Sequence, residues 1–273
     1  MTNVTPGPRL RWETGFAPGH GVRLFVRRVV EPPGQPVLLL HGLGVSGSVL
    51  QPFARRLLPE LAAVVPDLRG HGQSDAPDDG YLPADYAGDL VELITQDDSL
   101  TRVPVVGHSL GALVGMHLAS QRPELVAWLV LLDPPLDPRL RNTEVDAVYR
   151  LRHAAAGELE AYLLERDPGG GELLANALAK EFRAATDAAF ETLQRARPFT
   201  ALPVAAPTLV VQADPAHGGV LGDQAAAAAV ATLGSARLRK IAGATHAVHA
   251  SHPAEVAAAI RECARHSKTS PTQ

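Results

Sequence analysis

The segment from Val103 to Ala119, VPVVGHSLGALVGMHLA, begins with the pattern of a strand and ends with the pattern of a helix. Ser109 lies at the join, between glycines at positions 107 and 111. A strand that turns directly into a helix needs small residues beside the turn, since Cβ atoms there would collide. The segment therefore predicts a short apolar strand, a sharp turn and a helix, which is a repeating unit of α/β proteins.

The same alternation extends through the first half of the chain. Residues 9–30 contain two strand-like runs separated by Gly and Pro, and they predict a hairpin. Short apolar runs then alternate with runs of helical spacing up to Asp133; the strand candidates are PVLLLHG, AAVVPD, RVPVVG and VAWLVLLD. This order predicts a parallel sheet with helices on both faces and right-handed connections.

The alternation stops at Asp133. Residues 134–206 hold helical runs split by PGGG, with no strand candidate up to about residue 203, and the strand pattern returns in PTLVVQAD at 207–214. Two further runs, ARLRKIAG and the helical PAEVAAAIRECARH, follow. We expect one α/β core, residues 1–133 and 207–273, interrupted by a helical cap over 134–206.

Composition narrows the class of protein. The 273 residues are 46% apolar and 20% charged, values typical of a soluble globular protein. A net charge of −4 without blocks of like charge argues against a nucleic-acid or anionic-membrane partner. No apolar stretch approaches the roughly 20 residues of a membrane span, and the N-terminus lacks the apolar run of a signal peptide. We expect a cytoplasmic protein; the oligomeric state is not readable.

The lone cysteine and the histidine spacing exclude two other kinds of site. Cys263 lies in an Ala-rich helical run and has no partner for a disulfide within the chain. The spacing of histidines and acidic residues matches no metal-ligand pattern, so we expect neither a metal nor another cofactor.

The segment Gly107-His108-Ser109-Leu110-Gly111 matches G-x-S-x-G, a motif that places a nucleophilic serine on a sharp strand-to-helix turn. The turn projects the hydroxyl out at the carboxyl edge of the sheet, and the N-terminus of the following helix favours negative charge there. A phosphate-binding loop is excluded because its lysine and glycine spacing are absent. We predict that Ser109 is a nucleophile.

A serine nucleophile needs a base that takes its proton. His246 follows the final strand candidate by a short Gly-Ala-Thr loop, so it too belongs at the carboxyl edge of the sheet. His249 and His252 lie close behind it in AVHASHP. We predict His246 as the base and keep His249 as the second candidate.

The base in turn needs an acid that orients it. Asp214 is the last residue of PTLVVQAD, and Asp133 is the last residue of VAWLVLLD. With either acid the chain order is Ser, acid, His, as expected of hydrolases with this nucleophile motif. Asp214 is the favoured candidate and Asp133 the alternative. Asp67 precedes the serine, and we interpret it, with Arg69 and His71, as part of a structural loop network.

An oxyanion formed at the attacked carbonyl needs two fixed N–H donors. The first expected donor is the backbone of Leu110, directly after the serine. The second is expected in HGLGVSGSV after the strand at 36–40, at Leu43.

Four motifs in this order, LLLHGLG, VPDLRGHGQSD, VVGHSLGALVG and AGATHAVHASHP, resemble the α/β-hydrolase fold superfamily over residues 28–133 and 205–266. The resemblance implies a mostly parallel eight-stranded sheet with a helical cap inserted after the sixth strand. It also implies a triad of Ser109, Asp214 and His246, with Leu43 and Leu110 as the oxyanion hole. One departure concerns the acid: Asp214 directly follows Ala213, where the family commonly has a glycine and the acid a few residues later.

These features predict a serine hydrolase that cleaves a small carboxylic ester or lactone through an acyl-enzyme. Carbon–carbon bond hydrolases, amidases and perhydrolases use the same triad and stay open as alternatives. Outside enzymes, the alternative is a ligand-binding protein on a hydrolase fold. Five aromatic side chains of the predicted cap are expected in the cap interior more than in a substrate pocket; they are Tyr149, Tyr162, Phe182, Phe190 and Phe199.

Overall fold

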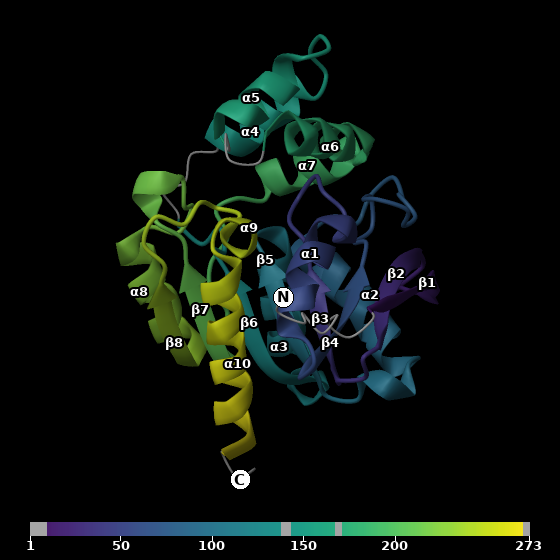
Figure 1. The fold of residues 1–273 in the computed structure, drawn as a ribbon, viewed down its shortest axis with the longest axis vertical. Coiled ribbons are helices and arrows are strands. Elements are labelled where there is room, and N and C mark those ends of the chain that lie inside the picture. Colours follow the sequence, from purple (N-terminus) through teal and green to yellow (C-terminus); the bar gives the residue numbers. More distant parts are fainter. Residues whose placement is uncertain (1–9, 138–142, 167–170, 270–273) are drawn as a thin grey trace, which may run out of the picture.

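The computed structural model describes residues 10–137, 143–166 and 171–269. They form one eight-stranded sheet in the order β1-β2-β4-β3-β5-β6-β7-β8 (Figure 1). The strands are β1 Arg11–Pro18, β2 Arg23–Glu31, β3 Gln35–Leu40, β4 Leu61–Pro66, β5 Val103–His108, β6 Val126–Leu132, β7 Val204–Gln212 and β8 Gly234–Lys240. Only the pairs β1–β2 and β2–β4 are antiparallel. The predicted hairpin and the mostly parallel sheet are confirmed.

Helices cover both faces of this sheet (Figure 1). They are α1 Gln51–Ala54, α2 Pro83–Thr95, α3 Leu110–Gln121, α4 Thr143–Leu151, α5 Glu158–Arg166, α6 Gly171–Ala184, α7 Asp187–Arg195, α8 Asp223–Leu233, α9 Val248–Ser251 and α10 Pro253–Thr269. Successive residues of a strand point to opposite faces, so one strand contributes to both cores. In β3, Leu38 and Leu40 face one core, and Val37 and Leu39 face the other.

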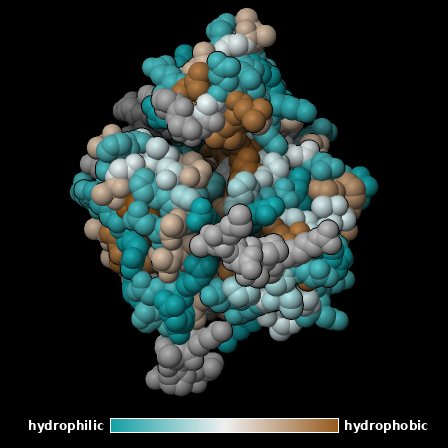
Figure 2. Space-filling model, in the orientation of Figure 1, coloured by the Kyte–Doolittle hydropathy of each residue, from teal (hydrophilic) through white to brown (hydrophobic). Residues whose placement is uncertain are grey.

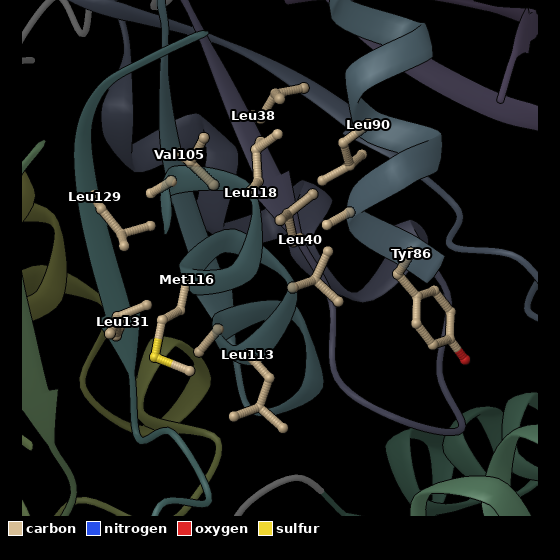
Figure 3. Close-up of a cluster of buried hydrophobic side chains, with 14 of the residues drawn as sticks. Leu38, Leu40, Tyr86, Leu90, Val105, Leu113, Met116, Leu118, Leu129 and Leu131 are labelled. Atoms are coloured by element: carbon tan, nitrogen blue, oxygen red, sulfur yellow. The ribbon is translucent and has the colours of Figure 1, made fainter. Parts of the chain in front are cut away.

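The first core lies between the sheet and helices α2, α3 and α8. Figure 3 shows leucines and valines of β3, β5 and β6 meeting side chains of α3, and Leu90 and Tyr86 entering from α2. The second core lies between the opposite face and helices α1, α9 and α10, where Cys263 is buried. Together these cores hold the strand ends, and the loops that follow them, at fixed positions.

The turn between β5 and α3 depends on two glycines. A Cβ on Gly107 would stand 2.1 Å from the carbonyl oxygen of Gly111, and a Cβ on Gly111 would stand 2.4 Å from the carbonyl oxygen of Leu40. Real Cβ atoms do not approach other atoms this closely, so neither position accepts a side chain without movement of the backbone. Ser109, between them, has φ 51° and ψ −112°, a strained conformation for a residue with a side chain.

Helices α4–α7 follow β6 and lie above the end of the sheet where the strands β5 and β6 finish (Figure 1). The backbone N–H of Thr186 donates to the carbonyl of Gly70, with N and O 2.9 Å apart, and so ties this helical insertion to the core. Figure 2 shows hydrophobic residues gathered on the insertion and at its junction with the core. Strand β7 starts at Val204, three residues before the expected 207, because Val204 already pairs with Gly234.

The division of the chain into a core and a cap stays a prediction.

Within the described part of the chain, no helix is both long and apolar enough to cross a lipid bilayer.

We expect Gly107→Ala to lower the free energy of unfolding by at least about 2 kcal/mol, because the new Cβ forces β5 and α3 apart. Gly15→Ala is the matched control, since nothing lies within 4 Å of a Cβ built there. Its expected effect is within about 0.5 kcal/mol. Urea unfolding of both variants measures the difference, and equal stabilities would contradict the packing account.

Candidate active site

Ser109 lies at the end of β5 and the beginning of α3, where the side chain is partly exposed. Its backbone N–H donates to the carbonyl of Leu132 at 3.0 Å, which anchors the turn to the neighbouring strand β6. Leu110 is the first residue of α3. Its N–H belongs to the first helical turn, which has no acceptor within the helix and is open to another partner.

The loop after β3 lies beside this serine. A Cβ built on Gly42 would stand 3.5 Å from the Cβ of Ser109, so the backbone that precedes Leu43 passes directly along the nucleophile turn. Leu43 is partly buried and packs against both the core and the insertion. The structure thus brings Leu43, Ser109 and Leu110 to one edge of the sheet.

His246 reaches the same edge from the loop after β8. Its Nδ1 lies 2.7 Å from Oδ2 of Asp133. A carboxylate oxygen only accepts, so Nδ1 carries the proton and Nε2 is left as the basic atom. The side chain of His246 is 27% exposed while that of Asp133 is fully buried. The imidazole therefore has one end fixed in the protein interior and remains partly open to solvent.

Asp133 has its own set of partners. The backbone N–H groups of Ala213, Val220 and Leu221 point at its two carboxylate oxygens, at 2.8 to 3.4 Å. Its φ of 43° is unusual for a residue with a side chain. Hydrogen bonds from three N–H groups hold the carboxylate in one orientation toward His246.

The prediction that Asp214 contacts the base is corrected by this geometry: Asp133, the alternative, holds that place. Asp214 accepts from the N–H groups of Ala216 and Gly243, at 3.0 and 2.9 Å, and pairs with His217. The hydrogen bond from Gly243, followed by that from Ala216, holds the pKa of Asp214 below its usual value. Asp214 thus fastens the end of β7 to the turn that precedes His246.

Two further histidines surround the base. The ring centroids of His108 and His246 are 4.7 Å apart, and those of His108 and His249 are also 4.7 Å apart. Burial, and then the neighbouring His246, lower the pKa of His249 to about 4. His249 is therefore a buried neutral ring packed behind the site. Sequence reasoning kept it as a second base and did not single out His108.

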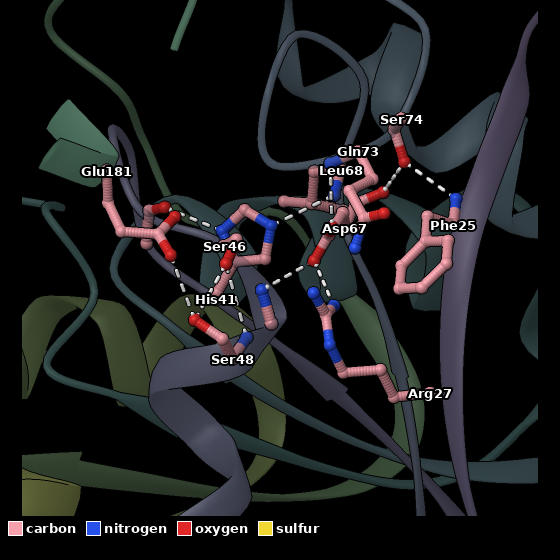
Figure 4. Close-up of polar contacts among 12 residues, drawn as sticks. Phe25, Arg27, His41, Ser46, Ser48, Asp67, Leu68, Gln73, Ser74 and Glu181 are labelled. Carbon is pink, nitrogen blue, oxygen red and sulfur yellow. Dashed lines mark hydrogen bonds and ion pairs between the residues drawn. The ribbon is translucent and has the colours of Figure 1, made fainter. Parts of the chain in front are cut away.

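Asp67 holds a loop, but with other partners than the predicted Arg69 and His71. Asp67 is buried and accepts hydrogen bonds from Arg27 and from the N–H groups of Gly47 and Gln73 (Figure 4). Gly47 continues the loop that starts at His41, so this carboxylate holds the segment that contains Leu43. Arg69 forms a separate buried pair with Asp89.

His41 and His71 are buried neutral rings near this network. The Nδ1–H of His71 donates to the carbonyl of Arg69 at 2.8 Å, whereas its Nε2 is buried without a hydrogen-bond partner in the described part of the chain. Burial, and then the neighbouring His41, lower the pKa of His71 to about 3. His71 therefore remains uncharged in the folded protein from neutral pH down to about pH 3.

Two aromatic residues of the insertion, Phe182 and Phe190, pack within it and also reach the loop after β3. Phe190 is buried with Leu159 and Ala179, as expected for an interior residue. Phe182 and Phe190 nevertheless also contact the loop after β3, since a Cβ on Gly44 would stand 2.3 Å from Phe182 and 2.9 Å from Phe190. Gly44, at φ 81°, lets these rings approach the expected oxyanion loop.

One polar contact also joins the insertion to this loop region. The hydroxyl of Ser48 donates to Oε1 of Glu181 at 3.0 Å (Figure 4).

Among the described residues, no group of three His, Cys, Asp or Glu side chains is arranged to hold a metal ion.

Residues 37–259 match the model of the alpha/beta hydrolase family. The chain belongs to this family of hydrolytic enzymes. The match reaches from β3 into α10, so it includes Leu43, Ser109, Leu110, Asp133 and His246. The resemblance inferred from the four motifs is confirmed.

Several proteins of known or assigned activity are similar to parts of the chain. A 2-(acetamidomethylene)succinate hydrolase of Mesorhizobium japonicum is 35% identical over 144 residues, 50% of each chain. A lipase of Mycobacterium tuberculosis is 39% identical over 129 residues, 46% of this chain and 48% of its own. The chain spans about half the length of the curated relatives it matches.

Solved structures resemble the whole fold. That of E-2-(acetamidomethylene)succinate hydrolase has a TM-score of 0.75 at 26% identity, covering 93% of this chain and 100% of that one. An esterase from Exiguobacterium antarcticum has a TM-score of 0.76 at 21% identity, covering 94% and 100%. At that lower identity the likeness concerns the fold alone.

We expect acid to destabilise the protein partly through His71. The unfolded chain takes up a proton on this histidine near pH 6.5, whereas the folded protein does so only near pH 3. The contribution of this residue to stability is therefore complete above about pH 6.5. It falls as the pH decreases toward 3, by up to about 1.4 kcal/mol per pH unit.

Urea unfolding of wild type and His71→Asn at pH 7, 6 and 5 measures this contribution. The variant is expected to lose less stability between pH 7 and 5 than wild type does. His20→Asn, which removes an exposed histidine, is the control and keeps the wild-type dependence. Identical pH dependence in all three proteins would contradict a buried neutral His71.

Proposed function

We propose that the protein is a serine hydrolase in which Ser109 is the nucleophile, His246 the general base and Asp133 the acid that orients His246. The observation that carries the proposal is the 2.7 Å hydrogen bond between His246 and the fully buried Asp133, at the sheet edge where Ser109 occupies the strained turn. A base held by a buried carboxylate beside a projecting serine is the arrangement that activates a hydroxyl.

The reaction follows from the tautomer of His246. With Nδ1–H donated to Asp133, Nε2 accepts the proton of the Ser109 hydroxyl while the serine oxygen attacks the substrate carbonyl. The imidazolium then gives this proton to the leaving group, which departs and leaves an acyl-enzyme. Water, deprotonated by the same Nε2, attacks the acyl-enzyme, and the proton returns to Ser109 as the acid product leaves.

Negative charge develops on the carbonyl oxygen in both steps. We assign its stabilisation to the backbone N–H groups of Leu43 and Leu110. The support is that the loop containing Leu43 runs along Ser109, and that Leu110 opens helix α3, whose N-terminus favours negative charge.

A small carboxylic ester or lactone is the proposed substrate class. The relative named as a lipase supports an ester. Phe182 and Phe190, which press on the loop beside Leu43, place apolar surface where the acyl or alcohol part of a substrate would lie. The helical insertion would then act as a cap that sets the size of the accepted group.

An amide is the second candidate. The relative named 2-(acetamidomethylene)succinate hydrolase resembles this chain both in sequence, at 35% identity over half its length, and in fold, at 26% identity. Its name specifies an acetamido group, which contains an amide bond. The same serine, histidine and aspartate would act on an amide carbonyl.

The test is hydrolysis of p-nitrophenyl acetate, butyrate and octanoate by wild type and Ser109→Ala, together with labelling by a fluorophosphonate. We expect activity on a short ester and a loss on the order of 10⁴-fold or more in kcat/KM for Ser109→Ala. Ser99→Ala, which removes an exposed hydroxyl on a turn before β5, is the control and should keep wild-type activity.

Three other outcomes are informative. If the wild-type protein is inert on all three esters but labelled at Ser109, the assignment of the catalytic residues stands and simple esters are excluded as substrates. Lactones, amides, peracid formation and carbon–carbon bonds would then be assayed. A protein that is both inert and unlabelled would overturn the proposal and favour a ligand-binding protein on this fold. Activity retained in Ser109→Ala would exclude Ser109 as the nucleophile.

A further inference from the structure

We propose that His108 is a positioning residue that holds the loop of His246 in register with the nucleophile turn and the oxyanion loop. The inference rests on the proposed function, because it assigns the imidazole of His108 to the support of His246. The observation behind it is that one buried ring in the nucleophile turn touches two other segments that are far from it in the sequence.

The first contact is to the base loop. Nε2 of His108 lies 3.0 Å from the backbone carbonyl oxygen of His246. A carbonyl only accepts, so Nε2 carries the proton and donates. The bond is made to the main chain of His246 itself, 138 residues away along the sequence. It therefore fixes the backbone from which the imidazole of His246 projects.

The second contact is to the loop after β3. A Cβ on Gly42 would stand 3.1 Å from Nδ1 of His108 and 3.5 Å from the Cβ of Ser109. The opposite edge of the His108 ring thus lies against the backbone that precedes Leu43. His108 is itself the residue before Ser109, so a single imidazole lies between the base loop and the expected oxyanion loop.

Packing leaves this ring little freedom. His108 is 8% exposed and lies against the rings of both His246 and His249. The ring of His249 in turn packs edge-on against Phe53 of α1, with centroids 6.1 Å apart. Burial, followed by the two neighbouring histidines, holds the pKa of His108 well below its usual value. A neutral ring of fixed tautomer can donate from Nε2 throughout the range in which His246 acts as a base.

The two hydrogen bonds to His246 fix different parts of this residue. Asp133 fixes the imidazole through Nδ1, and His108 fixes the main chain through the carbonyl. Loss of the second bond would leave the imidazole paired with Asp133 but free to shift with its loop. A displacement of about 1 Å in a reacting group costs as much as 100-fold in rate.

The test uses three substitutions of His108. His108→Phe keeps a ring and removes the donor. His108→Gln places an amide N–H near the position of Nε2, and His108→Asn has an amide too short to reach the carbonyl of His246. His117→Phe is the control, because His117 is a partly buried histidine on α3, eight residues beyond Ser109.

We expect His108→Phe and His108→Asn to lower kcat by about 10- to 100-fold with KM changed less than about twofold. His108→Gln is expected to recover most of the activity, and His117→Phe to match wild type. If His108→Phe does not fold, the comparison of His108→Gln with His108→Asn decides, since equal activity of these two folded variants would overturn the proposal. So would full activity of folded His108→Phe.

A second readout separates this proposal from the proposed function. The proton on Nδ1 of His246, bonded to Asp133, gives a proton NMR resonance well downfield of the amides. Displacement of the His246 loop should broaden or shift this resonance in His108→Phe and His108→Asn but not in His108→Gln. If the wild type shows no Ser109-dependent activity, the proposed function fails, and the resonance still decides on His108. A resonance unchanged in His108→Asn would then overturn the positioning role.

Discussion

The close approach of strand β5, helix α3 and strand β3 at the nucleophile turn is the constraint on which the site depends. A side chain at position 111 would clash with the backbone carbonyl of Leu40. A side chain at position 107 would clash with the backbone carbonyl of Gly111. This contact lets the backbone strain at Ser109 persist, because the packed core on both sides of the sheet supports it. The loops that carry Leu43, Asp133 and His246 follow strands β3, β6 and β8 of the same sheet.

Three hydrogen-bonded carboxylates set the orientation of these loops. Asp67 holds the segment after Leu43, Asp214 holds the turn before His246, and Asp133 accepts three backbone N–H groups as well as His246. The two buried carboxylates, Asp67 and Asp133, have hydrogen-bond partners, as buried charge requires. In the proposed reaction only Asp133 serves the base directly.

Much of this could be predicted from the sequence, because the relevant signals are local. The apolar runs, the glycines around Ser109 and the Gly-Ala-Thr loop before His246 indicated the sheet and placed both residues at its carboxyl edge. The choice between Asp133 and Asp214 could not be made that way, since both end strands and both precede the histidine. It depends on contacts between residues far apart in the sequence: Asp133 reaches His246, whereas Asp214 bonds the N–H groups of Ala216 and Gly243. His108 was missed because its partner lies 138 residues away.

The most direct measurement for the central claim is the rate at which a fluorophosphonate labels Ser109 in Asp133→Asn and in Asp214→Asn. Asparagine at 133 cannot hold the His246 tautomer that accepts the serine proton, so labelling should slow by about 10³-fold or more. Asp214→Asn should stay within about tenfold of wild type, because Asp214 braces the turn without contacting the imidazole. The opposite ranking, or equal rates in both variants, would contradict the assignment of Asp133 to His246.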